Sequence, residues 1–164
     1  MSNWENQFNN AKTNSSSEYM KPGNWLLRID KIAKGENRKG VGNFKLEGTV
    51  IHCFDGEQKT GASITDMYSE KSDFFFSEVK ALVAALAGKD AVNVNFGDLE
   101  AISSDAQPLK GIVVEYSAWE KESKNGFKFT KTACKGMITK SKWEATATPE
   151  ELERFQDLRF KKED

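Results

Sequence analysis

The chain has 164 residues, of which 38% are hydrophobic and 30% are charged, and its formal net charge is −1. This length fits one domain with a substantial core, and no apolar run approaches the length of a membrane span. The N-terminus lacks the basic start and apolar stretch of a signal peptide, and the distant cysteines Cys53 and Cys134 suggest reduced thiols. We therefore expect a cytoplasmic protein with no disulfide scaffold, no metal site and no membrane partner.

Composition and charge divide the chain into three segments. Residues 1–21, rich in Asn, Ser and Lys, are predicted to form a flexible arm. Residues 22–142 form the folded domain, and residues 143–164 form a C-terminal helix with a mixed-charge tail. The near-neutral total argues mildly against a nucleic-acid partner, but residues 110–142 hold eight Lys against three Glu, whereas residues 143–164 hold seven acidic against four basic residues.

Three strands are expected in the first half of the chain, at residues 24–34, 43–54 and 61–68, because apolar and polar residues alternate there. A glycine in the middle of the second strand, Gly48, predicts the bulge or sharp bend that a small closed barrel needs. The predicted inward-facing residues of the first two strands are Trp25, Leu27, Ile29, Phe44, Leu46, Gly48 and Val50.

The hydrophobic period changes to that of a helix over residues 74–88, with Gly88 as the terminating residue. We interpret its first residues, Phe74–Phe76, as a plug that closes the bottom of the barrel, since burial is the default for Phe. The following region is less regular: residues 91–96 are compatible with a strand and residues 98–102 with a short turn of helix.

Residues 111–136 are predicted to form a β-hairpin, because Asn125-Gly126 is a strong turn signal between two strand-like runs. A two-residue loop would place Trp119 opposite Thr132, so that Trp119, Lys121 and Lys128 share a polar face. An aromatic ring among cations on a wet face is typical of single-stranded nucleic-acid binding. The apolar face would carry Ile112, Val114, Tyr116, Ala118, Phe127, Phe129 and Ala133.

The predicted order is three strands, a helix and two strands, followed by a helix capped at Thr148 and running to about Phe160. A mainly β, five-stranded Greek-key barrel with an α-helix between strands three and four is the oligonucleotide/oligosaccharide-binding (OB) fold. A β-sandwich has no place for the central helix, and a ferredoxin-like fold requires a helix after the first strand.

Four segments carry a family resemblance: GNWLLRIDKIAKG, NFKLEGTVIHCFDG, FFFSEVKALVAALAG and LKGIVVEYSAWEKESKNGFKFTKTACKGM. In their order and spacing, over residues 22–138, they resemble the single-stranded DNA-binding proteins of tailed bacteriophages. The resemblance implies an OB-fold that protects single strands during phage replication or recombination, in the host cytoplasm and without a cofactor. Many such proteins contact phage or host replication partners through an acidic tail tipped with an aromatic residue, whereas here Phe160 is not terminal and the tail is mixed in charge.

OB-folds bind across strands two and three, between the loop joining strands one and two and the loop joining strands four and five. These loops correspond to residues 34–42 and 120–126, and we expect them to converge on one cleft. Trp119 is the leading stacking candidate, whereas core and binding roles both stay open for Phe44, Phe127 and Tyr68. The predicted nucleic-acid-binding residues are Lys34, Arg38, Lys39, Phe44, Lys45, Tyr68, Trp119, Lys121, Lys124, Phe127 and Lys128.

Other functions find less support in the sequence. There is no P-loop, no acidic cluster for paired magnesium ions and no His paired with a nucleophile in a recognisable motif, and His52 is interpreted as structural. The main alternative is an OB-fold protein-interaction module that binds a peptide or a replication partner without nucleic acid. Binding of double-stranded DNA is disfavoured, because no basic recognition helix is evident. Whether the protein forms a homodimer stays open.

Overall fold

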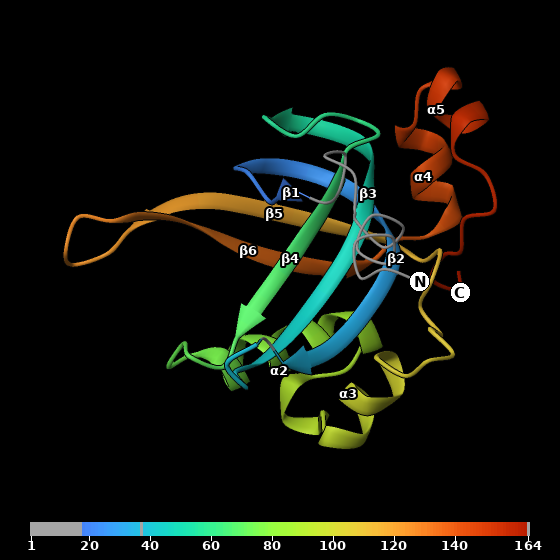
Figure 1. Cartoon of the computed structure of the whole chain (residues 1–164). Coiled ribbons are helices and arrows are strands. Elements are labelled where there is room, and N and C mark those ends of the chain that lie inside the picture. Colours follow the sequence, from blue (N-terminus) through green and yellow to red (C-terminus); the bar gives the residue numbers. More distant parts are fainter. Residues whose placement is uncertain (1–17, 37, 164) are drawn as a thin grey trace, which may run out of the picture.

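The computed structural model describes residues 18–36 and 38–163 and is mainly β, as predicted (Figure 1). The strands are β1 (Glu18–Tyr19), β2 (Gly23–Glu36), β3 (Gly42–Gly56), β4 (Ser63–Ser69), β5 (Val113–Glu122) and β6 (Lys128–Met137). The helices are α2 (Phe75–Ala87), the 3-10 turn η1 (Ala91–Asn93), α3 (Phe96–Ile102), α4 (Lys140–Thr146) and α5 (Pro149–Arg154). In the described part of the chain, no helix is long and apolar enough to cross a membrane.

The strands form one sheet in the order β1-β4-β3-β2-β5-β6, in which the five long strands pair antiparallel with one another and the short β1 pairs parallel with β4. The prediction of a closed barrel is wrong in one respect: between the described parts of β4 and β6 no backbone pairing is formed, so the sheet stays open. Side chains bridge this gap instead, since the Thr132 hydroxyl of β6 lies 3.0 Å from Asp66 Oδ1 and 3.2 Å from the Tyr68 hydroxyl on β4. Helix α2 packs against both strands.

The alternation predicted for the first two strands is confirmed, and the inner face of the sheet packs with α2 into the main core. Gly48 is buried on this face, where a Cβ atom would lie 2.7 Å from Leu27 Cγ and 2.7 Å from the Arg28 carbonyl oxygen. The pairing of β2 with β3 shifts between Ile29 and Lys31, directly beside Gly48. The bulge predicted from Gly48 is therefore present, and it lies in the partner strand.

A second core covers the outer face of the sheet, and the C-terminal segment supplies half of it. Its buried residues are Leu26, Ile51, Val113, Ile138, Trp143 and Phe155, with Leu158 and Phe160 packed against them. Thr148 caps α5 in a capping box with Glu151, as predicted, and Glu151 Oε1 also lies 2.7 Å from His52 Nδ1 of β3. His52 therefore has the structural role that we expected.

The predicted C-terminal helix to about Phe160 is wrong in extent. Helix α5 ends at Arg154, and the chain then runs extended, with backbone bridges from Arg159 to Ile112 and from Lys161 to Thr139. Burial of Phe155 and docking of this extended stretch on the sheet override the local helical preference. An additional helix, α4, precedes α5 and buries Trp143.

Three local predictions also change. Residues 91–96 contain η1 and the start of α3 and form no strand.

Helix α2 ends at Gly88 in the left-handed conformation, as expected, but Phe74 and Phe76 are exposed, so that only Phe75 packs on the core. Glu18–Tyr19 pair with β4 and Met20 is buried, so the sheet begins before residue 22. The remainder of the predicted arm, residues 1–17, lies outside the described residues.

Candidate nucleic-acid interface

The β5–β6 hairpin is present, but its loop is one residue longer than predicted. The Ser123 amide donates to the Phe127 carbonyl at 2.8 Å, and the Gly126 amide donates to the Ser123 carbonyl at 3.0 Å. The loop therefore consists of residues 124–126, with Gly126 in the left-handed region at φ +84°. Three-residue hairpin loops commonly combine a type I turn with a left-handed glycine, and Asn-Gly serves this geometry as well as the two-residue one.

The additional loop residue changes the face on which each β6 side chain lies, because a one-residue shift in register moves every side chain of a strand to the other face of the sheet. Trp119 pairs with Lys131 and Lys121 pairs with Phe129. Phe129 and Phe127, predicted to point inward, are 40% and 73% exposed. The hairpin therefore exposes two more aromatic rings to solvent than the two-residue loop predicted.

Lys128 and Lys124 also differ in position from what the two-residue loop implied. Lys128 lies on the face opposite Trp119, where its ammonium is 3.5 Å from Glu120 Oε1. Lys124 is exposed in the hairpin loop. Of the cations predicted for this hairpin, Lys121 is the one that shares a face with Trp119.

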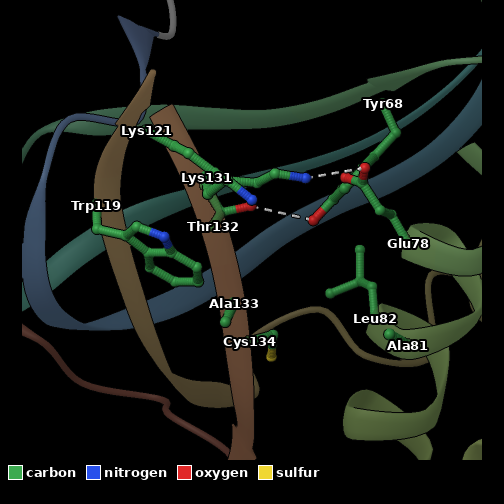
Figure 2. Close-up of a pocket in the computed structure, with 10 residues that line it drawn as sticks. All are labelled: Tyr68, Glu78, Ala81, Leu82, Trp119, Lys121, Lys131, Thr132, Ala133 and Cys134. Atoms are coloured by element: carbon green, nitrogen blue, oxygen red, sulfur yellow. Dashed lines mark hydrogen bonds and ion pairs between the residues drawn. The ribbon is translucent and has the colours of Figure 1, made fainter. Parts of the chain in front are cut away.

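A cleft of about 320 Å³ lies where the edge strand β6 faces α2, and we call it the hairpin cleft (Figure 2). It is lined by Tyr68, Glu78, Ala81, Leu82, Trp119, Lys121, Lys131, Thr132, Ala133 and Cys134. Figure 2 shows the Trp119 ring on the hairpin side, with Glu78 and Leu82 on the opposite side. Trp119 is 46% exposed, so its ring is accessible from the cleft.

Lys131 lies in this cleft, although it is not among the residues predicted to bind nucleic acid. Its ammonium lies 3.4 Å from Glu78 Oε1, 5.8 Å from the centroid of the Phe74 ring and 5.9 Å from that of the Phe129 ring. Cations within about 6 Å of an aromatic centroid are attracted by the ring. The hairpin cleft thus combines the accessible Trp119 ring with two lysines, and the Phe129 and Phe74 rings lie beside it, near the Lys131 ammonium.

Hydroxyl groups and one carboxylate form a hydrogen-bond network beneath the cleft. Tyr68 and Tyr116 donate to Asp66 Oδ2 at 2.8 and 3.1 Å, and Thr132 donates to Asp66 Oδ1 at 3.0 Å. Burial raises the pKa of Asp66 above its usual value, although the three hydroxyl donors oppose that shift. Burial and the nearby Asp66 also raise the pKa of Tyr68. Tyr68, for which core and binding roles were both open, is half-buried in the cleft lining, where its hydroxyl helps to hold β4 beside β6.

The loop between β2 and β3 does not join this cleft. Figure 1 shows the turn between β2 and β3 well apart from the tip of the β5–β6 hairpin, so the two basic loops do not converge. Lys34 points to α3, where its ammonium lies 5.0 Å from the centroid of Phe96 and 3.6 Å from Glu100 Oε2. Arg38 and Lys39 lie in the exposed turn.

Two further predicted site residues lie on β3. Phe44 is 1% exposed and belongs to the main core, so of the two roles open for it the core role is confirmed, and its inclusion among the nucleic-acid-binding residues is wrong. Lys45 is half-buried on the outer face of the sheet, paired across the strands with Ala33 and Met67. Neither residue lines the hairpin cleft.

A second exposed aromatic surface lies on the two adjacent helices, and we call Phe76 and Phe96 with their surroundings the α2–α3 patch. Two hollows of about 350 and 250 Å³ share Phe76, Phe96 and Leu99. Their rims carry Lys34, Lys80, Glu36 and Glu70, a balanced set of charges. Helical periodicity could have indicated this surface, since three consecutive residues of a helix cannot all face one core.

Neither a metal-binding cluster nor a match to a known protein identifies the function of this site. Among residues 18–36 and 38–163, no group of three or more His, Cys, Asp and Glu side chains is arranged to hold a metal ion. Neither a family model nor a curated protein matches the chain.

Proposed function

We propose that the protein is a non-catalytic, largely sequence-independent single-stranded DNA-binding protein. The observation that carries this proposal is the hairpin cleft, in which the exposed Trp119 lies with Lys121 and Lys131, while the exposed Phe129 ring lies 5.9 Å from the Lys131 ammonium beside the cleft. Stacking platforms next to cations are the common means of binding single strands without reading their sequence. The resemblance of residues 22–138 to phage proteins supplies the setting, which is protection of single strands in replication or recombination.

The arrangement of the sheet supports an OB-type barrel as the scaffold. The long strands follow the order β4-β3-β2-β5-β6, and α2 lies between β4 and β5 in the chain. The OB-fold is a five-stranded, partly open Greek-key barrel, and this strand order with a helix before the last hairpin is compatible with it. The binding surface proposed here differs from the common one, because it uses the last hairpin and α2 rather than strands two and three.

Binding would combine two contributions in the cleft and on the adjoining surface of the hairpin. Bases stack on Trp119 and Phe129, each stacked base contributing ~1–3 kcal/mol. Phosphates approach Lys121 and Lys131, with Lys124 at the hairpin tip as a further contact. The surplus of lysine on this hairpin explains how a chain with a formal net charge of −1 can attract a polyanion.

Partner recruitment through a free C-terminal tail, as in many of the phage proteins that the chain resembles, has little support. The Arg159 amide donates to the Gly111 carbonyl at 2.8 Å, and the Lys161 amide donates to the Ile138 carbonyl at 2.9 Å. Phe160 packs against the outer core. The protein-interaction alternative is better supported by the α2–α3 patch, because exposed aromatic residues within a rim of mixed charge are typical of protein interfaces.

A fluorescence titration tests the proposal. Of the tryptophans in the described residues, Trp25 and Trp143 are buried and Trp119 is exposed, so a Trp4→Phe background makes the emission report on Trp119. A single-stranded oligonucleotide of mixed sequence should quench this emission at low salt, and added salt should reverse the quenching. The duplex of the same sequence should have little effect. Unchanged emission, together with no mobility shift of the oligonucleotide, would contradict the proposal.

A further inference from the structure

The polar groups at the base of the hairpin cleft are mainly hydrogen-bond acceptors. The hydroxyl protons of Tyr68, Thr132 and Tyr116 are directed at Asp66. Each hydroxyl has one donor and two acceptor sites, so these three groups can form further hydrogen bonds only as acceptors. A ligand that enters the cleft beside Trp119 therefore meets acceptor atoms at the base of the cleft, and the side-chain donors in the lining are the two lysine ammoniums and the Trp119 indole N–H.

Glu78 adds a carboxylate to this acceptor set. It lies in the first turn of α2, and in the free protein its partner is the Lys131 ammonium at 3.4 Å. When a phosphate binds Lys131, the Glu78 carboxylate loses part of the electrostatic stabilisation that the Lys131 ammonium provides. An unpaired carboxylate in a partly buried site is costly, so a ligand that donates a hydrogen bond to Glu78 is favoured over one that cannot.

We infer that Glu78 gives the hairpin cleft a base preference, for cytosine over uracil and thymine. This inference rests on the proposed function, since it concerns the base that stacks at Trp119. Cytosine presents an N4 amino group that donates to a carboxylate, and Glu is a known partner of this group. Uracil and thymine present the O4 carbonyl at the same position, and its lone pairs face those of Glu78. A site that is built to accept a hydrogen bond rejects the analogue that lacks the donor.

Oligo(dC) and oligo(dU) of equal length form the test pair. The two pyrimidine rings are of equal size and neither carries a methyl group, so stacking is closely matched. Phosphate contacts are identical, so the affinity ratio should be insensitive to salt although each affinity is not. In mildly alkaline buffer, where cytosine is unprotonated, the wild-type protein should bind oligo(dC) roughly ten-fold more tightly than oligo(dU).

The variant Glu78→Gln tests whether the carboxylate of Glu78 causes the preference for cytosine. A glutamine amide can accept from N4 or donate to O4, so the ratio should fall toward one. Both affinities should rise, because Lys131 loses a competing partner. Glu120→Gln is the matched control: Glu120 is an exposed glutamate of the hairpin, 3.5 Å from the Lys128 ammonium and outside the cleft lining, and its loss should leave the ratio unchanged. Far-UV circular dichroism should show the same fold for both variants.

The outcomes separate this inference from the proposed function. Equal affinity of the wild-type protein for the two homopolymers would overturn the base preference, and so would a ratio that Glu78→Gln leaves unchanged. If the wild-type protein binds neither homopolymer nor an oligonucleotide of mixed sequence, the proposed function itself fails.

Discussion

The hairpin cleft and the α2–α3 patch both expose aromatic rings, yet the charges around those rings differ. The cleft has two lysines, Lys121 and Lys131, against the single carboxylate of Glu78 in its lining. The patch has balanced charges on its rim, although Phe96 is 63% exposed, more than Trp119. An exposed ring by itself therefore does not indicate a nucleic-acid site, because phosphates also require a local surplus of cations.

The two regions also differ in what lies beneath the rings. Under the cleft is the Asp66 hydrogen-bond network, which joins β4, β5 and β6. Under the patch are apolar side chains of α2 and α3, such as Val79, Val83 and Leu99. Polar groups that fix the orientation of a ligand are thus available in the cleft, whereas the patch offers mainly apolar contact. Each of the following predictions tests this difference, beginning with the largest expected effect.

Trp119→Ala should weaken binding of single-stranded DNA by about ten-fold or more, because it removes a stacking contact worth ~1–3 kcal/mol. The side chain is 46% exposed, so the fold should tolerate the change. Fluorescence anisotropy of a labelled oligonucleotide measures the affinity. An unchanged affinity would remove the cleft from the binding surface.

Lys121→Gln and Lys131→Gln should each weaken binding modestly and flatten its salt dependence. The slope of log affinity against log salt should change by about 0.7 for each phosphate that the variant no longer neutralises. Lys128→Gln is the control, because Lys128 lies on the opposite face of the same hairpin and is paired with Glu120. Equal changes in slope for all three variants would mean that only the total charge matters and that the cleft is not the binding surface.

Asp66 should make the stability of the protein depend on pH, because burial raises its pKa in the folded state. The folded protein then holds the Asp66 proton more tightly than the unfolded chain does. This contribution to stability is fully present below the usual aspartate pKa of 3.8 and is lost as the pH rises through the raised value. The free energy of unfolding of Asp66→Asn, measured relative to wild type in urea, should therefore increase with pH over this window. If the difference in the free energy of unfolding between Asp66→Asn and wild type does not change with pH, the pKa of Asp66 is not raised in the folded protein.

Phe96→Ala should leave the affinity for single-stranded DNA unchanged, the smallest effect of the series. Its ring is well exposed, but the nearby Lys34 ammonium is already 3.6 Å from Glu100. If Phe96→Ala weakens binding as much as Trp119→Ala does, the bound strand extends over the α2–α3 patch and the contrast between the two regions fails. Mobility-shift titrations of both variants, carried out side by side, decide between these outcomes.

Several elements could be predicted from the sequence because their signals are local. The alternation in β2 and β3, the end of α2 at Gly88 and the capping box at Thr148 depend on residues a few positions apart, and all three are present. Trp119 was found for the same reason, since its own strand places it on the face opposite Tyr116. These features follow from the period of the chain and from the backbone preferences of single residues.

The cleft itself was decided only by the tertiary structure. Its residues come from β4, α2, β5 and β6, and no sequence spacing reports that Glu78 and Lys131 meet. The exposure of Phe129 depends on one residue of loop length, for which Asn-Gly is compatible with both alternatives. Burial of Phe155 and Phe160 on the outer face likewise depends on a partner surface far away in the chain. The sequence by itself thus determined the strands, the main helix and the leading aromatic residue, whereas register and long-range packing determined which side chains gather around it.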